Sequence, residues 1–277
     1  MAIILDGKMI RDQILAELKP RVAAFDRAPQ LVVILVGDNP ASQVYVKNKI
    51  AACELLGIRS RKLSPPVSIT TGELLAIVNE LNVDPEVQGI LVQLPLPAQV
   101  DAMSVLEAVD PSKDVDGFHP VNAGKLLSGA PGLRPCTPSG VMELLRRYQI
   151  PIEGRKAVVV GRSEIVGKPM AILLLQANAT VTICHSRTSS LAEECRRADI
   201  LVAAIGRAEY LGEEHIQPGA VVIDVGMNRV NGRLTGDVDP VEMARLSSAY
   251  TPVPGGVGPL TIAMLMSNTV LAAEQAR

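Results

Sequence analysis

Aromatic side chains and excess positive charge are both scarce in this sequence. Its 277 residues include no Trp, two Phe and four Tyr, so the core must be built from Leu, Ile, Val, Ala and Met. The net charge of -2 lacks the cationic excess that drives binding to nucleic acid. We therefore expect an ordinary globular protein without a nucleic-acid partner.

Cysteine and histidine are also few, and long apolar runs are lacking. The four cysteines form no CxxC pair, which disfavours disulfides and thiolate metal sites and fits a reducing cytoplasm. The three histidines are unpaired at helical spacing, so no metal is expected. No apolar run approaches the roughly 18 residues that span a bilayer, and the N-terminus turns polar at Asp6. We expect a cytoplasmic protein with no membrane association.

Short β-branched runs alternate with helical patterns along the whole chain. This alternation is typical of βαβ units around parallel strands, so the expected fold class is α/β. The expected strands are 31–36, 59–63, 89–94, 157–160, 180–184, 200–204 and 221–225. The expected helices are 7–25, 40–56, 70–82, 138–149, 167–177, 189–197 and 259–274.

Residues 111–138 have little periodicity and are rich in Pro, Gly and Asp, which indicates a loop-rich connection between two α/β halves. We expect a first domain at 1–120, with the C-terminal helix 259–277 packing back onto it. The second domain, 121–258, should be a Rossmann-like doubly wound parallel sheet. A cleft between the two domains is the expected ligand site.

The segment KAVVVGRSEIVGKPMAILLLQ places a strand before a glycine-containing turn and a helix. A dinucleotide site needs this context, because a tight turn lets the backbone approach phosphates and the following helix directs N–H groups at them. The turn is G-x-S-x-x-x-G, formed by Gly161, Ser163 and Gly167, and it departs from GxGxxG. A purely structural strand-to-helix turn is the alternative explanation of the two glycines.

The next strand ends in His185, Ser186, Arg187 and Thr188, and no carboxylate occurs in 168–191. An NAD site usually has an acidic residue here for the ribose diol, whereas a 2′-phosphate needs cations or hydroxyl donors. NADP is therefore favoured, although a solvated loop is the alternative. Asp224, at the end of a later strand, either contacts a ligand or caps a turn, and the cap is favoured.

The first half contains polar residues in otherwise apolar elements. Tyr45 and Lys49 are four residues apart and share one face of an expected helix, with Val44, Ala51, Ala52 and Leu55 expected toward the core. Gln93 interrupts an apolar strand and needs polar partners there. A Tyr can stack on a planar ring and a Lys can act as an acid or base. The alternative is a half-buried Tyr beside a solvent-facing Lys.

Six motifs in order across about residues 2–274 resemble the methylenetetrahydrofolate dehydrogenase/cyclohydrolase family: VYVKNK, VQLPLP, KDVDGFH, PCTPSG, VVVGRSEIVGKP and TPVPGGVGPLT. The resemblance implies NADP-dependent oxidation of 5,10-methylenetetrahydrofolate, hydrolysis of the methenyl product, a role in one-carbon metabolism, and a homodimer. The alternatives are a monofunctional dehydrogenase, another NADP-dependent dehydrogenase, and a folate-binding or nucleotide-binding protein without catalysis.

The resemblance also implies residue roles. Tyr45 stacks near the pterin and aminobenzoate, Lys49 is the key catalytic group of the cyclohydrolase step, Gln93 assists Lys49, and Asp116 binds the pterin. Three residues are implied beside the folate and the nicotinamide: Pro254, Gly255 and Gly256. The implied cofactor-binding residues are Gly161, Arg162, Ser163, Ile165, Val166, Gly167, Ser186 and Arg187.

Overall fold

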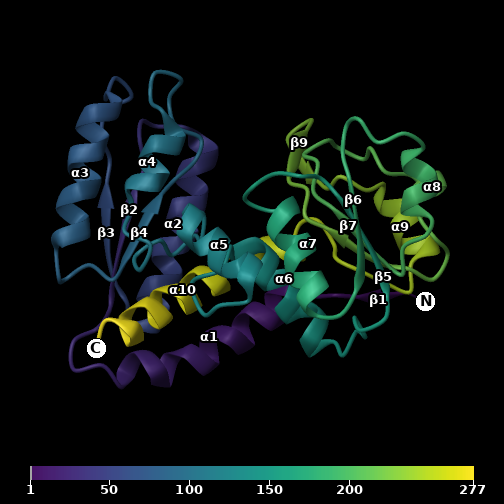
Figure 1. Ribbon diagram of the computed structural model, residues 1–277, viewed down its shortest axis with the longest axis horizontal. Helices are drawn as coiled ribbons and strands as arrows, with labels where there is room; N and C mark the ends of the chain where they lie inside the picture. The colour runs from purple at the N-terminus through teal and green to yellow at the C-terminus, as the bar shows by residue number, and fades with distance from the viewer. Residues whose placement is uncertain (1) are drawn as a thin grey trace. The chain divides into compact units, whose positions relative to one another are not determined.

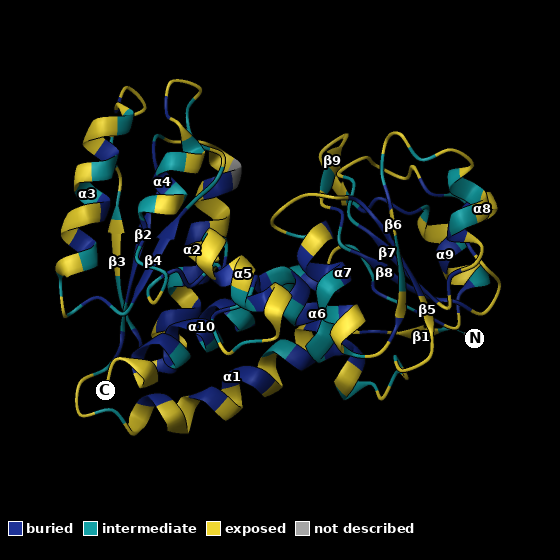
Figure 2. Ribbon diagram, viewed as in Figure 1, coloured by how far each residue is buried: buried dark blue, intermediate teal, exposed yellow. Residues whose placement is uncertain are grey.

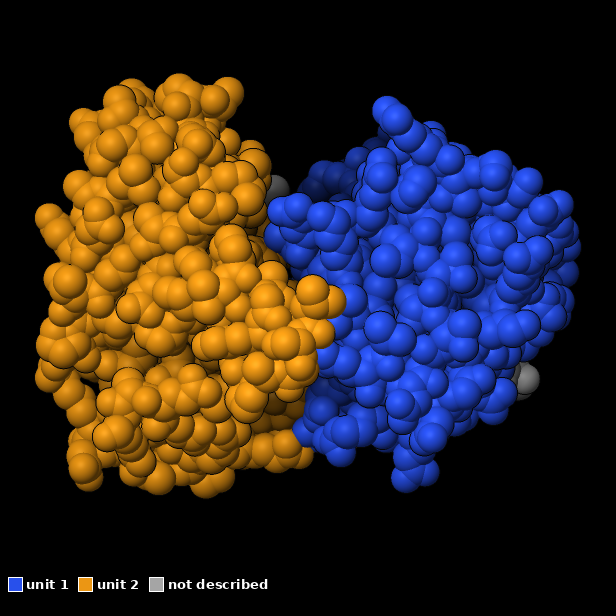
Figure 3. Space-filling view, viewed as in Figure 1, with its two compact units in different colours: residues 1–12, 137–261 blue, residues 13–136, 262–277 orange. Residues whose placement is uncertain are grey.

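The computed structural model describes residues 2–277, with the side chain of Ala41 outside the description. The chain forms two compact units (Figure 3). Unit 1 consists of Met1–Asp12 and Thr137–Thr261, and unit 2 of Gln13–Cys136 and Ile262–Arg277. The chain passes from unit to unit within α1 (Gly7–Ala23), at the start of α6 (Cys136–Arg147) and within α10 (Val257–Gln275).

Unit 2 is built on a three-stranded parallel sheet in the order β3-β2-β4. Its strands are β2 (Gln30–Ile34), β3 (Arg59–Leu63) and β4 (Gly89–Val92). Its helices include α2 (Pro40–Leu56), α3 (Thr71–Val83), α4 (Ala102–Ala108) and α5 (Pro120–Ser128). Leu74 and Val78 of α3 and Val105 of α4 pack with Ile34 and Ile90. Helices α3 and α4 therefore cover the sheet, and their outer faces are exposed (Figure 2).

Unit 1 contains a six-stranded sheet in the order β1-β11-β8-β7-β5-β6, and all its pairings are parallel. The strands are β1 (Ile3–Ile4), β5 (Lys156–Val160), β6 (Thr180–Cys184), β7 (Ile200–Ala203), β8 (Val221–Asp224) and β11 (Ala249–Tyr250). The chain goes from β5 to β6 on one side and then returns to β7 on the other side of β5 (Figure 1). Such a reversal is where doubly wound sheets bind ligands.

Three helices, α7 (Gly167–Gln176), α8 (Leu191–Cys195) and α9 (Pro240–Leu246), connect these strands, together with the 3-10 helix η1 (Glu213–His215). An antiparallel hairpin, β9 (Asn228–Val230) with β10 (Arg233–Thr235), follows β8. Asn231 and Gly232 both have positive φ in its two-residue turn, as a type I′ turn requires. The expected α/β fold class and the seven expected strands are confirmed, whereas this hairpin was not expected.

The unit boundaries differ from the domain ranges expected from the sequence. Residues 121–136 belong to unit 2 because α5 is tied to it: Asn122 Nδ2 donates to Pro111 O at 2.8 Å and to Asp114 Oδ2 at 2.9 Å. Residues 2–12 belong to unit 1 because β1 pairs with β11. The expected loop-rich connection therefore contains a helix, which begins at Pro120 and ends before Gly129 in the left-handed region. These are ordinary start and stop signals of a short helix.

Helix α10 corrects the expectation that no segment is long and apolar enough to cross a membrane. Its 19 residues pass that test by length and hydropathy. Within this apolar stretch 56% is buried inside the protein. Leu265, Met266 and Val270 are fully buried. Asn268 in the same helix donates to two backbone carbonyls. The helix is therefore packed as a core element.

Two buried carboxylates organise the loops after β7 and β8. Asp224 accepts backbone N–H groups from Gly226, Asp237 and Val238 at 2.9 Å each, and burial raises its pKa to about 6. Asp237, fully buried, accepts N–H groups of residues 205–207 and the Asn228 side-chain amide. Asp224 thus has the structural role that the sequence favoured.

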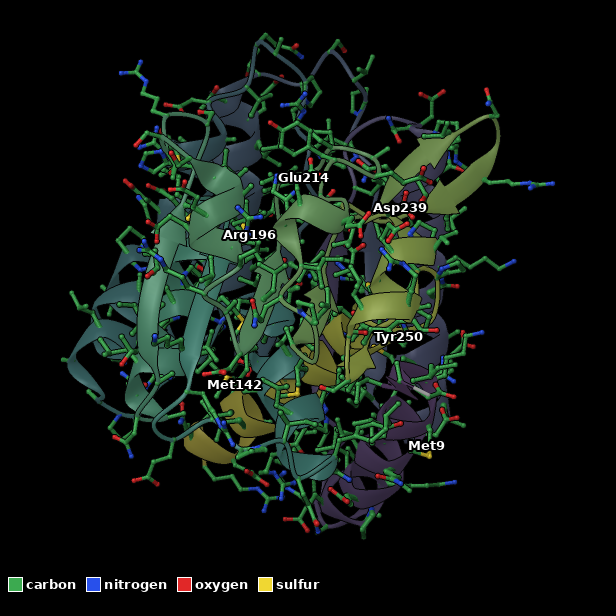
Figure 4. The ribbon with its side chains drawn as sticks, turned by 90° about the vertical axis from the view of Figure 1, so that its right-hand side faces the viewer. Met9, Met142, Arg196, Glu214, Asp239 and Tyr250 are labelled. Atoms are coloured by element: carbon green, nitrogen blue, oxygen red, sulfur yellow. The ribbon has the colours of Figure 1, made fainter. Side chains whose placement is uncertain are left out.

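Replacing Asp237 with Ala should destabilise unit 1 by about 3 kcal/mol, because the backbone N–H groups of residues 205–207 lose the buried carboxylate that accepts them. The matched control is Asp239→Ala, two residues away at the start of α9 (Figure 4), where the carboxylate caps Val241 N and Glu242 N. Loss of that cap should cost about 1 kcal/mol. Urea unfolding followed by hydrogen exchange of β7 and β8 measures both, and equal losses would contradict the prediction.

Candidate functional site

Lys49 lies on the buried face of α2. Its side chain is 8% exposed, and it shares this face with Val46, Cys53 and Leu56, which are at most 4% exposed. Of the four residues expected toward the core, Ala52 is buried, whereas Ala51 is exposed and Val44 and Leu55 are each 59% exposed. The helix is therefore rotated from the expected orientation, and the alternative of a solvent-facing Lys49 is wrong. A lysine on the core face needs polar partners.

Gln93 provides the first of these partners. Lys49 Nζ donates to Gln93 Oε1 at 3.1 Å. The Gln93 amide is held in turn, because Nε2 donates to Leu94 O at 2.8 Å and the backbone N donates to Ile34 O at 2.9 Å. Gln93, expected inside an apolar strand, directly follows β4, and its oxygen is fixed toward Lys49, in agreement with the pairing that the family resemblance implies.

Asp116 provides a counter-charge in the loop that follows the Ile90–Asp114 bridge. Burial is the main cause of its raised pKa, which the positive charge of Lys49 lowers and the negative charge of Asp114 raises. Asp114 itself has a structural role, because its Oδ2 accepts hydrogen bonds from His119 N at 2.8 Å and from the Asn122 side-chain amide. The structure therefore brings Lys49, Gln93 and Asp116 together in unit 2.

Tyr45 lies one turn before Lys49 on α2, at the surface, with a relative exposure of 36% against 8% for Lys49. This combination leaves the phenol ring accessible to a ligand while the amine beside it stays shielded. A hollow of about 680 Å³ elsewhere in unit 2 lies along β3 and α3, is lined by Arg61, Leu63 and Ile77 among others, and contains none of the predicted site residues.

Two further residues, Cys136 and Asn268, lie beside Asp116 and were not predicted from the sequence as single site residues. The thiol of Cys136 donates to Val115 O at 3.2 Å, and its pKa is raised chiefly by burial and then by the Asp116 charge. Asn268, from α10, lies 3.6 Å from the Cys136 sulfur. Their contacts join segments far apart in the sequence, so no local pattern reveals them. Only the PCTPSG motif pointed to Cys136.

The turn after β5 has no room for side chains at its two glycines. A Cβ at Gly161, where φ is +133°, would lie 2.2 Å from Ala204 O, and one at Gly167 would lie 2.3 Å from Gly161 O. Gly161 N donates to Cys184 O of the neighbouring strand. The backbone thus stays close to the ends of β6 and β7, as a phosphate-binding turn requires.

The backbone N–H groups that are available to bind phosphate do not come from helix α7, contrary to what was expected. Ser163 caps α7, because Oγ accepts Val166 N and Gly167 N at 3.2 Å and its carbonyl accepts Lys168 N. Within the described chain, the N–H groups of residues 162–165 donate to no protein acceptor. The expectation that the helix itself offers free N–H groups is wrong here. The exposed loop that precedes it, with Arg162, Ser163 and Ile165, offers them instead.

Ser186 and Arg187 lie in the turn that follows β6, next to the end of β5. Thr188 Oγ1 accepts His185 N at 2.8 Å, and His185 Nδ1 accepts Arg187 N at 3.2 Å. These bonds use backbone and neighbouring groups and leave the Ser186 hydroxyl and the Arg187 guanidinium exposed. Hydroxyl and cationic donors therefore lie beside the Gly161 turn, without a carboxylate between 168 and 191.

Residues 254–256 form a tight loop in unit 1 just before α10. Gly7 N donates to Gly255 O at 3.0 Å, and a Cβ at Gly7 would lie 1.7 Å from Gly256 O. Gly255 has φ of +110°, and a Cβ at Gly256 would lie 2.6 Å from Thr251 Cβ. The start of α1 therefore supports the Pro254-Gly255-Gly256 loop by direct backbone contact. Among the described residues, no group of three His, Cys, Asp or Glu side chains is placed to hold a metal.

Two family descriptions match this chain. Residues 5–116 match the catalytic domain of tetrahydrofolate dehydrogenase/cyclohydrolase, and residues 135–277 match its NAD(P)-binding domain. Curated relatives from Solibacter usitatus and Burkholderia mallei, both called bifunctional protein FolD, are 58% and 56% identical. The alignments cover 98% and 99% of this chain and 97% and 98% of the relatives.

Solved structures give the same result. The bifunctional FolD enzyme of Campylobacter jejuni is 49% identical, with a TM-score of 0.97 over 99% of both chains. The Trypanosoma brucei FolD enzyme, solved with NADP cofactor and an inhibitor, is 38% identical, with a TM-score of 0.94 over 100% of this chain and 99% of that one. The chain belongs to the tetrahydrofolate dehydrogenase/cyclohydrolase family.

Proposed function

We propose that this chain oxidises 5,10-methylenetetrahydrofolate with NADP and hydrolyses the resulting 5,10-methenyltetrahydrofolate to 10-formyltetrahydrofolate. The observation that carries the proposal is the buried Lys49 amine, bonded to Gln93 and facing Asp116, in a chain that also contains a dinucleotide-binding turn. A folate-binding protein without catalysis has no use for a shielded amine held in this way.

NADP fits the unit 1 residues, which combine a side-chain-free turn at a strand reversal with exposed Ser186 and Arg187. When bound, NADP supplies the nicotinamide ring that accepts the hydride. The loop of residues 161–167 would hold the pyrophosphate, through the N–H groups of residues 162–165. Ser186 and Arg187 would bind the 2′-phosphate, which gives the preference for NADP over NAD.

In the oxidation, the methylene C–H bond breaks and its electron pair leaves as hydride, which produces a methenyl cation stabilised by two neighbouring nitrogens. The task of the protein is alignment. Tyr45 would stack on the folate rings and Asp116 would bind the pterin, while Pro254, Gly255 and Gly256 would line the folate and the nicotinamide. Each of these groups binds or orients without transferring a proton.

In the hydrolysis, water adds to the methenyl carbon, and the Lys49 amine accepts a proton from it. Gln93 Oε1 accepts a hydrogen bond from Nζ and so fixes the direction of the amine. The carbon–N5 bond then breaks, N5 takes up a proton, and the formyl group remains on N10. The same amine thus serves a reaction that a monofunctional dehydrogenase does not perform.

A homodimer and a cytoplasmic location complete the proposal. Strand β6 is an edge of the unit 1 sheet, and nearby Leu175 and Ile183 are 57% and 42% exposed. An apolar sheet edge of this kind favours pairing with a second copy of the chain. The four cysteines are free and buried, which suits a reducing compartment. Light scattering of the purified protein tests the dimer.

Lys49→Met should lower cyclohydrolase activity by about a hundredfold or more, because the proton acceptor of the attacking water is lost. Dehydrogenase activity should persist in part, so methenyltetrahydrofolate should accumulate. Reduced nicotinamide and the methenyl chromophore, followed together, report both steps. Lys47→Met, an exposed position on the same helix, is the control. Hydrolysis by Lys49→Met above the nonenzymatic rate would refute the role.

The pH dependence of folate binding should differ between Lys49→Met and the wild type. The Lys49 charge lowers the pKa of Asp116, so its removal should raise that pKa further. If the Asp116 carboxylate binds the pterin, the loss of binding on the acid side should begin at higher pH in Lys49→Met than in the wild type. Titration calorimetry with tetrahydrofolate at several pH values measures this, and an unchanged acid limb would contradict the role of Asp116.

Gly161→Ala should raise the KM for NADP by about tenfold or more, because the new Cβ meets Ala204 O and displaces the turn. Gly154→Ala is the matched control, since Gly154 also has positive φ but open space around its Cβ. Its KM for NADP should stay within about twofold of the wild-type value. Equal effects of the two substitutions would show that the Gly161 contact is unimportant for the cofactor.

A further inference from the structure

Asn268 lies where the final helix meets two loops of unit 2. It is 5% exposed, and its Nδ2 donates to Val115 O and to Arg134 O, each at 2.8 Å. Both hydrogens of the amide are therefore donated to backbone carbonyls, and the two carbonyls belong to segments that are far apart in the sequence. The residue makes these contacts from the middle of α10 (Val257–Gln275).

The two loops are in direct contact beside this amide. Gly117 has φ of +75°, and a Cβ there would lie 2.4 Å from Arg134 C and 2.5 Å from Pro135 N. Cys136 adds a further link through its bond to Val115 O. Asp116 thus lies between Val115, whose carbonyl accepts two hydrogen bonds, and Gly117, whose backbone lies against residues 134 and 135 of the second loop.

We propose that Asn268 is a positioning residue that fixes the Asp116 carboxyl for pterin binding by joining the 115 and 134 carbonyls. The inference rests on the proposed role of Asp116 in the folate reaction. Asn268 itself does not need to touch the substrate. Its amide determines where the Asp116 loop lies relative to α10, and hence the distance between the carboxylate and Lys49.

An amide suits this position better than other side chains of similar size. A Leu at 268 would remove the one side chain that bonds to both carbonyls, and Val115 O would keep only the weaker bond from the Cys136 thiol. A shift of the Val115 carbonyl would move Asp116, the next residue in the chain, and orientation errors of about 1 Å cost binding and rate steeply. The effect should therefore appear in folate kinetics as well as in stability.

The test compares Asn268→Leu with Thr269→Val, the adjacent buried position on α10, whose hydroxyl donates only to Leu265 O within the helix. Both should lower Tm. Asn268→Leu should also raise the KM for methylenetetrahydrofolate about tenfold, whereas the KM for NADP, and both constants of Thr269→Val, should stay within about twofold. If Asn268→Leu fails to fold, Asn268→Ser, which keeps one hydroxyl donor, replaces it and should give an intermediate KM.

A double-mutant cycle with Asp116→Ala separates positioning from general destabilisation. In the Asp116→Ala background, Asn268→Leu should change the KM for folate less than about twofold, because the group it positions is gone. Equal effects in both backgrounds, or an unchanged folate KM in Asn268→Leu, would overturn the positioning role. A wild-type protein without folate turnover would instead overturn the proposed function on which this role rests.

Discussion

The burial of the Lys49 amine is the constraint around which unit 2 is arranged. A lysine on the core face of a helix is costly unless its nitrogen is hydrogen-bonded and its charge is balanced. Gln93 supplies the bond and Asp116 the opposing charge. These partners are held in turn by backbone contacts to Ile34, Leu94 and the loop beside Asn268. The sheet and α10 thus hold Gln93 and Asp116 in the positions where they stabilise the buried Lys49 amine.

The cofactor turn of unit 1 depends instead on glycines at positions that have no room for a side chain. At Gly161, Gly167 and Gly7 the space for a Cβ is already taken by carbonyl groups of neighbouring segments. Backbone can therefore approach backbone, and N–H groups of the turn face outward instead of being covered. A polar ligand such as a pyrophosphate is best met by such a surface, whereas the Lys49 cluster needs specific side chains.

The sequence predicted the strands well because parallel strands buried on both faces are continuous apolar runs, as in β2 and β7. It predicted Lys49 and Gln93 as partners through a family resemblance and through the cost of a polar residue in an apolar strand. It did not predict the rotation of α2, whose buried face contains the lysine itself. The Asn231-Gly232 turn of the hairpin had a recognisable signal that was overlooked. The Asn268 contacts had none, because they arise only when distant segments pack.

Helix α10 has a consequence for how the protein is made. Residues 257–261 of this helix belong to unit 1 and 262–275 to unit 2, and it is translated after every other described element. Neither unit is therefore complete until this helix has been synthesised, although multidomain chains usually fold their N-terminal domain first. Each unit lacks part of its residues until α10 has been made, and the same helix completes both. Loss of α10 would therefore remove buried residues from both units at once, Leu260 from unit 1 and Leu265 from unit 2.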